Sequence, residues 1–137
     1  MASVLVIEDH PDLAHSLGEL LRLYGHSVRV ALDGEEGLAE CEENLPDVVI
    51  LDIGLPTIDG VQVAQELRSR YGPSLKLIAC TALDDGRTRL RMIRAGFDAL
   101  LVKPAPVDEI LAAISGPRVG YRSGSRGIAP GVGTSAS

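Results

Sequence analysis

Five short apolar runs alternate with longer stretches of helical period along this chain. A strand inside a parallel sheet reads as a run of Val, Leu and Ile, because helices cover both of its faces. The alternation therefore predicts an α/β protein of (βα)5 type, a doubly wound, five-stranded parallel sheet with helices on both faces. The runs that we interpret as strands are 4–7, 27–30, 48–51, 75–80 and 99–102.

Cap and stop signals place a helix after each predicted strand. The expected helices span about 13–24, 34–44, 61–71, 85–95 and 107–115. Glycines end the first and fourth of them, at Gly25 and Gly96, and Gly25 stands where a helix C-terminus favours a residue that tolerates positive φ. The fifth helix has Pro106 at its cap position, which offers no side-chain acceptor, so we expect this helix to fray most easily. The first helix is indicated by apolar residues at helical spacing, which are Leu13, Leu17, Leu20, Leu21 and Tyr24.

The 137 residues suit one domain, which we expect to span 1–115. From Gly116 onward the composition changes to Gly, Ser, Arg and Pro without apolar period, which predicts a flexible tail over 116–137. This tail holds three arginines and no acidic residue, so the residues before it carry 10 basic and 19 acidic side chains, a net charge of −9. Such an acidic body argues against direct binding of nucleic acid.

The chain has no apolar run of membrane-spanning length, and its N-terminus lacks the basic segment of a secretory leader. We therefore expect a cytoplasmic protein with no membrane partner. Cys41 and Cys80 lie far apart without the spacing of metal ligands, and we interpret both as reduced packing residues.

Acidic residues follow two of the predicted strands. Glu8 and Asp9 come after the first strand, and Asp52 comes after the third. Because parallel strands end at one edge of the sheet, these three carboxylates are expected to meet there. Their repulsion is unfavourable without a cation, and oxygen ligands favour Mg²⁺. The pattern predicts a magnesium site.

Two more polar residues are expected at the same edge, Thr81 after the fourth strand and Lys103 after the fifth. An ionised carboxylate such as that of Asp52 can attack phosphorus without a separate base and form an acyl phosphate. Lys103 and the Thr81 hydroxyl can then neutralise charge on the transferred group. Each residue alone would be interpreted as a cap or a solvated side chain, whereas together they indicate phosphoryl transfer.

Four segments, EDHPDL, DVVILDIGLPTIDG, CTA and AGFDALLVKP, resemble the motifs of receiver domains of two-component response regulators. They occur in the family's order over residues 3 to about 115. The resemblance implies a flavodoxin-like fold and transfer of a phosphoryl group to Asp52. The implied donor is a sensor histidine kinase or a histidine phosphotransfer protein.

The resemblance also implies the roles of individual residues. Asp9 would bind the metal directly, Glu8 largely through water, and the backbone carbonyl of Gly54 would be the third protein ligand. Thr81 would be the switch hydroxyl and Lys103 the phosphate-binding lysine, whose bond to the following proline is often cis in this family. The chain would be a phosphoacceptor with weak autophosphatase activity and not an enzyme acting on a separate substrate.

Three positions bear on switching and lifetime. Leu100 stands where the family usually has Tyr or Phe, so the signal is expected to pass through the loop and helix after Thr81 with little or no ring rotation. Gly54 and Leu83 flank the path of hydrolytic water in the family. Neither can hold a water through its side chain, which predicts slow self-dephosphorylation.

Two alternatives remain from the sequence alone. A phosphohydrolase with an aspartyl nucleophile usually has a second Asp two residues on, where this chain has Gly54. A non-phosphorylated pseudo-receiver would act only as a binding module.

No output domain follows the receiver in this sequence, so we expect output through a downstream protein target. The chain would then be a single-domain regulator, a phosphorelay shuttle or a hybrid-kinase receiver. Homodimer formation stays open.

Overall fold

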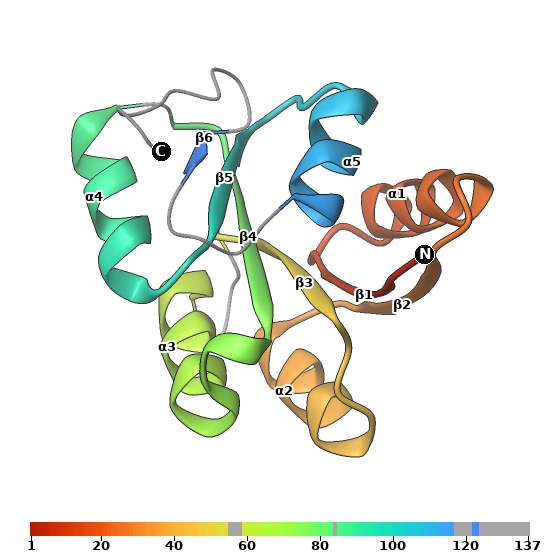
Figure 1. Cartoon of the computed structure of the whole chain (residues 1–137), viewed down its shortest axis with the longest axis horizontal. Coiled ribbons are helices and arrows are strands. Elements are labelled where there is room, and N and C mark those ends of the chain that lie inside the picture. The colour runs from red at the N-terminus through yellow and green to blue at the C-terminus, as the bar shows by residue number, and fades with distance from the viewer. Residues whose placement is uncertain (55–58, 84, 117–121, 124–137) are drawn as a thin grey trace.

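Five parallel strands form the centre of the computed structural model, which describes residues 1–54, 59–83, 85–116 and 122–123. They lie in the order β2-β1-β3-β4-β5, which is the order of flavodoxin-like doubly wound sheets. The predicted (βα)5 fold is confirmed (Figure 1). Every predicted strand agrees to within one residue with the observed strands, β1 (Ser3–Ile7), β2 (Ser27–Ala31), β3 (Val48–Asp52), β4 (Lys76–Thr81) and β5 (Ala99–Val102).

A further strand, β6 (Arg122–Ser123), pairs in parallel with β5 at the edge of the sheet. This strand was not predicted from the sequence, because two polar residues carry no strand pattern. It lies within the segment expected to be a tail. The other residues of that segment beyond Gly116 are outside the described part of the chain.

The helices begin and end where the cap residues indicate. Asp33, Asp59 and Asp85 each accept a hydrogen bond from a backbone N–H in the first turn of the helix that follows. Gly25 adopts positive φ, as predicted, and so does Gly96, where the fourth helix was expected to stop. The elements are α1 (Pro11–Leu23), α2 (Gly34–Glu43), α3 (Gly60–Tyr71), the 3-10 turn η1 (Gly72–Ser74), α4 (Gly86–Ala95) and α5 (Val107–Ser115).

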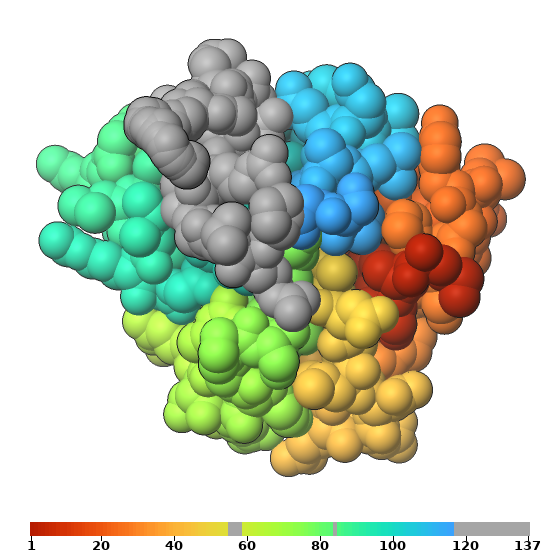
Figure 2. Space-filling view, viewed as in Figure 1, coloured from red at the N-terminus to blue at the C-terminus, as the bar shows by residue number. Residues whose placement is uncertain are grey.

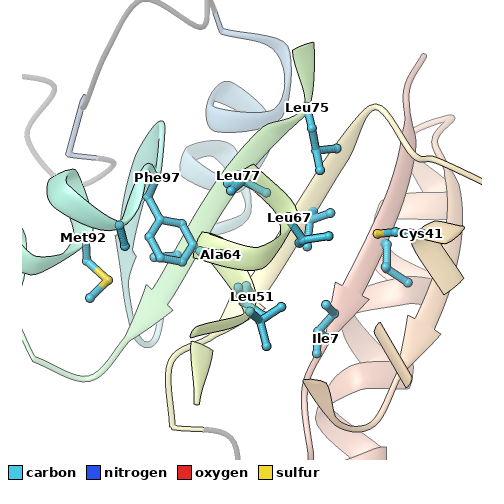
Figure 3. Packing of buried hydrophobic residues seen from close by; sticks show 14 of the residues in the cluster. Ile7, Cys41, Leu51, Ala64, Leu67, Leu75, Leu77, Met92 and Phe97 are labelled. Carbon is cyan, nitrogen blue, oxygen red and sulfur yellow. The ribbon is translucent and has the colours of Figure 1, made fainter. Parts of the chain in front are cut away.

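Helices cover both faces of the sheet, α1 and α5 on one and α2, α3 and α4 on the other (Figure 1). In the space-filling view the last three lie around the lower and left sides of the molecule (Figure 2). Beneath them Leu67, Leu77, Met92 and Phe97 belong to one continuous apolar core (Figure 3). The second core, under α1 and α5, contains Leu21, Ile78, Leu101, Ile110 and Ile114.

The buried face of α1 differs from its leucine pattern. Leu13 and Tyr24 are more than half exposed, whereas Ala14, Gly18 and Leu21 are buried. A Cβ at Gly18 would lie 3.5 Å from Val30, an ordinary van der Waals contact, so this side of the helix lies directly against β2. Helical spacing predicted the helix but not which side faces inward.

Helix α5 is held mainly at its C-terminal end. Its cap residue, Pro106, makes no side-chain cap bond, as predicted. At the other end the buried ammonium of Lys76 donates hydrogen bonds to the carbonyls of Ala113 (2.7 Å), Ile114 (3.0 Å) and Gly116. A cation is favourable there because the last carbonyls of a helix lack intrahelical donors.

None of the helices in the described residues is both long and apolar enough to cross a membrane.

Candidate functional site

The C-terminal ends of β1, β3, β4 and β5 meet along one edge of the sheet. Asp52 ends β3 and Thr81 ends β4, with Asp52 in register with Cys80 and Thr81 in register with Val102. Glu8 directly follows β1 and Lys103 directly follows β5. The sequence prediction that these residues share an edge is therefore confirmed by the strand register.

Lys103 forms ion pairs with the carboxylates of Asp52, at the end of β3, and Glu8, directly after β1. Its Nζ lies 3.1 Å from Asp52 Oδ1 and 3.4 Å from Glu8 Oε1. Both carboxylates are nearly buried, with side-chain exposures of 12% and 11%. Burial alone would lower the pKa of Lys103, but the hydrogen bond and charge of Asp52, followed by those of Glu8, outweigh it and raise the pKa above its ordinary value.

The edge carries more negative than positive charge. Asp9 adds a third carboxylate to Glu8 and Asp52, and Lys103 is the ammonium placed among them. His10 was not predicted as a site residue, yet its Nδ1 lies 3.3 Å from Glu8 Oε2 and 3.6 Å from Asp9 Oδ1. Ligand atoms of Glu8, Asp9 and His10 all lie within 4.8 Å of one another. A partly buried oxygen-rich cluster with excess negative charge fits a hard divalent cation.

Backbone groups complete the surroundings of Asp52 and Thr81. The Gly54 N–H donates to Asp52 Oδ1 at 3.2 Å. The Leu83 N–H donates to Thr81 Oγ1 at 3.1 Å, so the buried threonine is linked to the loop that leads toward α4. The metal-binding role of the Gly54 carbonyl stays a prediction.

Two features of β5 and its end concern positions singled out in the sequence. Leu100 is fully buried in the core under α3 and α4, where an aliphatic side chain has no ring to rotate. The peptide bond between Lys103 and Pro104 is cis.

The two cysteines are poor nucleophiles. Burial is the main reason that the pKa of Cys41 is raised to about 11 and that of Cys80 to about 12. Asp52 and Glu8 raise the pKa of Cys80 further, although Lys103 opposes them. Both thiols are therefore protonated at neutral pH, and both are free cysteines in the structure, in keeping with the prediction of packing residues.

Comparison with known proteins agrees with this geometry. The sequence model of one protein family, the response regulator receiver domain, matches residues 4–115. The transcriptional regulatory protein PrrA of Mycobacterium tuberculosis is 41% identical over 113 residues, which cover 81% of this chain and 47% of PrrA. The response regulator MprA of a Mycobacterium species is 38% identical over 109 residues, 80% of this chain and 47% of MprA. The chain thus spans about half the length of these relatives.

Solved structures show the same fold. The receiver domain of Francisella response regulator 1452 superposes with a TM-score of 0.78 at 28% identity, covering 83% of this chain and 93% of that one. A receiver domain from Clostridium thermocellum gives a TM-score of 0.78, also at 28% identity, covering 83% of this chain and 91% of that one.

Proposed function

The chain belongs to the family of response regulator receiver domains, and we propose that within a two-component system it accepts a phosphoryl group on Asp52 from a phosphohistidine. The observation that carries this proposal is the position of Lys103. Its ammonium lies 3.1 Å from the Asp52 carboxylate at the edge of the sheet where the acidic residues meet. A cation there is suited to a phosphoryl group that becomes attached to Asp52.

In the proposed reaction an Asp52 carboxylate oxygen attacks the phosphorus of the phosphohistidine. A new O–P bond forms as the N–P bond breaks, and the leaving imidazole nitrogen keeps the bonding pair and takes up a proton. No general base is needed, since the carboxylate is already ionised. Lys103 stabilises negative charge on the transferred group. The Gly54 N–H, which donates to Asp52 Oδ1, and the hydroxyl of Thr81, which ends the neighbouring strand β4, would also contribute.

Glu8, Asp9 and Asp52, together with the Gly54 carbonyl, are the proposed magnesium-binding groups. Bound Mg²⁺ would neutralise charge on a phosphoryl oxygen during transfer. Without a cation the Asp9, Glu8 and Asp52 carboxylates are balanced by one ammonium, which disfavours the approach of a phosphoryl group that is itself negative.

The direct test is phosphorylation of the purified chain by acetyl phosphate in the presence of Mg²⁺. We expect intact mass to show one added phosphoryl group in the wild type and none in Asp52→Asn. Asp108→Asn is the matched control, because it removes an exposed carboxylate on α5. Phosphorylation of Asp52→Asn to the wild-type extent, or of neither protein, would contradict the proposal.

We propose that phosphorylation is signalled through the loop after Thr81. Thr81 Oγ1 binds the Leu83 N–H, and a phosphoryl group that attracts this hydroxyl would break that bond and shift the start of α4. The other end of α4 is held by Arg68, which donates to the carbonyl of Gly96. Backbone amide shifts on phosphorylation should therefore be largest at residues 82–89, and in Thr81→Ala they should shrink. Identical inactive and phosphorylated conformations over 81–96 would refute this route.

The proposed donor is a sensor histidine kinase or a histidine phosphotransfer protein, and the proposed output is a changed contact with a downstream protein. PrrA, as a transcriptional regulatory protein, is about twice as long as the matching region. Whether output passes through a further domain is a property of the whole protein, so the receiver itself is assigned only the phosphoacceptor step.

A further inference from the structure

Helix α4 is uniformly basic on an acidic domain. It carries four arginines and no acidic residue, although the residues before the tail have a net charge of −9. Its buried side consists of Thr88, Met92 and Ala95. The arginines, on the remaining surface of the helix, are Arg87, Arg89, Arg91 and Arg94.

The outward side of α4 also has an apolar centre. Leu90 is 45% exposed and Ile93 is 46% exposed, and their i, i+3 spacing makes them neighbours on the helix surface. Among the described residues, no ion pair involves Arg87, Arg91 or Arg94. An apolar pair bordered by basic side chains is typical of a contact surface.

Helix α2 has the opposite character. It carries five glutamates and no basic residue. Its surface carries a shallow hollow of about 440 Å³. The residues that line this hollow are Glu36, Ala39, Glu40, Glu42 and Glu43. Within the described part of the chain, Glu35 and Glu43 have no ion-pair partner, whereas Glu40 pairs with Arg29 and Glu42 with Arg70.

The two helices cannot neutralise each other within one molecule. Both lie on the same face of the sheet, and each packs against α3, which separates them (Figure 1). In Figure 2 the long side chains of α4 project from the left of the molecule, whereas α2 lies at the lower right.

We propose that α4 of one molecule docks on the acidic hollow of α2 in a second copy of this chain. Leu90 and Ile93 would cover Ala39, and the arginines of α4 would face the glutamates that line the hollow. Since α2 and α4 lie on either side of α3, a two-fold axis running alongside α3 would form the contact twice. Such a closed pair is the commonest arrangement of homo-oligomers.

A second copy fits these surfaces better than a polyanion does. An extended nucleic acid or an anionic membrane would also meet the acidic remainder of the domain, which repels it. The α2 hollow of another copy is instead a compact acidic surface with an uncharged centre. The inference goes beyond the proposed phosphoryl transfer and concerns the unphosphorylated chain.

The contact is expected to be weak and sensitive to salt. Exposed ion pairs contribute little each, and two copies of a chain with net charge −6 repel each other overall. Raising NaCl from about 0.05 M to about 0.5 M shortens the screening length severalfold. We therefore expect association at high protein concentration in low salt and its loss in high salt.

Sedimentation equilibrium with charge-reversed variants tests the contact. One variant, R87E/R91E, makes α4 acidic, and the other, E35K/E43K, makes α2 basic. Each variant alone should associate at least about tenfold more weakly than the wild type, because attraction becomes repulsion. An equimolar mixture should recover the heavier species, since the acidic α4 then faces the basic α2 and the unchanged helices face each other.

The α2 variant separates this contact from a general effect of charge. Two Glu→Lys changes shift the net charge from −6 to −2, so general repulsion falls and nonspecific association would rise. Our proposal requires association to fall. The control E19K/D108K makes the same charge change on α1 and α5, on the opposite face of the sheet, and should associate at least as well as the wild type. Circular dichroism confirms that each variant is folded.

Several results would overturn the inference. These are a wild type that stays monomeric at low salt up to millimolar concentration, association that neither variant weakens, and variants that fail to recover when mixed. A mass that stops at two copies supports the two-fold arrangement. A mass that grows further, with the same response to both variants, supports the same helix contact in an open series. Phosphorylation of the variants at Asp52 is independent of all these outcomes.

Discussion

Lys103 is the residue on which the charge balance of the acidic edge depends. It lies within 3.4 Å of carboxylates from two strands that are far apart in sequence. Substitution by Met keeps most of the aliphatic stem and leaves Asp52 and Glu8 without their ammonium. The same change thus probes both phosphoryl transfer and folding.

We expect Lys103→Met to be less stable than the wild type at pH 7 by about 1 kcal/mol, a modest value because the lysine side chain is 36% exposed. The pKa of Lys103 is raised in the folded state. Its stabilisation is therefore fully present below the ordinary lysine pKa of about 10.4 and is lost as the pH rises through the folded-state pKa.

Urea unfolding of both proteins at pH 7 and across the range above about pH 10 measures this difference. The gap in unfolding free energy should close as the pH rises. Lys103→Arg, which stays charged across this range, should behave like the wild type at pH 7 and should keep its advantage over Lys103→Met as the pH rises. A gap that widens with pH would contradict the assignment.

The side chain at position 54 is expected to control how fast the phosphoryl group is lost from Asp52. A Cβ placed at Gly54 has no neighbour within 4 Å, so a longer side chain fits without strain. We expect a slow loss of the phosphoryl group from the wild type, and we expect Gly54→Asn to accelerate it severalfold because an amide can hold a water close to the phosphorus. Gly54→Ala, which fills space without a polar group, is the control.

Intact mass followed over time after removal of the phosphodonor gives these rates. A wild-type half-life of only seconds would show that water is positioned by some other group.

Single residues differed in how well the sequence could predict them. Asp52 and Lys103 were predictable because a strand end fixes where a side chain lies. His10 was not, because an exposed histidine before a helix has no pattern of its own, and its position beside Glu8 and Asp9 depends on the turn at the end of β1. Lys76 lies near the start of an apolar strand in the sequence, and nothing there predicts that its side chain is buried. The packing of α5 over it explains the burial.

At the scale of the element, the two ends of α5 are held differently. The missing N-terminal cap predicted the helix that frays most easily, and the ammonium of Lys76 holds its last carbonyls. Fraying should therefore concentrate at the first turn. The opposite ends of one short helix are expected to differ in protection.

Hydrogen exchange should show faster amide exchange near Val107 than near Ile114 in the wild type. Lys76→Met, which leaves the carbonyls without their donor, should remove this difference by accelerating exchange at the C-terminal end. Pro106→Asp adds a cap acceptor and should slow exchange in the first turn, with a gain of about 1 kcal/mol in stability. Uniformly strong protection over 107–115 in the wild type would contradict this account.

The ends of helices were predictable where a cap or stop residue lies next to the end that it determines. Asp33 and the glycines after α1 and α4 determine helix ends through one or two hydrogen bonds within a few residues. The inward side of α1 was only partly predictable from its leucines, because Leu17 and Leu21 pack in the core while Leu13 is exposed. β6 depends on pairing with β5 and had no sequence pattern.

At the scale of the whole molecule, we expect cation binding at the acidic edge to increase the stability of the fold. A cation that binds only the folded chain stabilises it in proportion to the logarithm of its concentration. Mg²⁺ at ten times its dissociation constant should stabilise the wild type by about 1.4 kcal/mol. Asp9→Asn should lose most of this gain.

Thermal unfolding at increasing MgCl₂ measures the effect, with NaCl at equal ionic strength as the control for screening. Asp12→Asn, a neutralised exposed carboxylate in the first turn of α1, should respond like the wild type. Equal shifts in all three proteins would show that Mg²⁺ acts as a nonspecific salt.

The global arrangement was the most predictable level. Alternating apolar runs define a parallel sheet, and such a sheet has one edge at which all strand-terminal residues meet. The charge on α2 and α4 was visible in the sequence, but its meaning required knowing that both helices lie on one face with α3 between them.

The contact between Lys76 and α5 has a practical consequence for protein engineering. The Gly116 carbonyl is one of the three that bind the Lys76 ammonium, so a chain cut or joined before Gly116 would lose part of this attachment. A reporter or effector domain fused to this receiver should therefore begin after Gly116. A junction placed there keeps all three hydrogen bonds between the Lys76 ammonium and the end of α5.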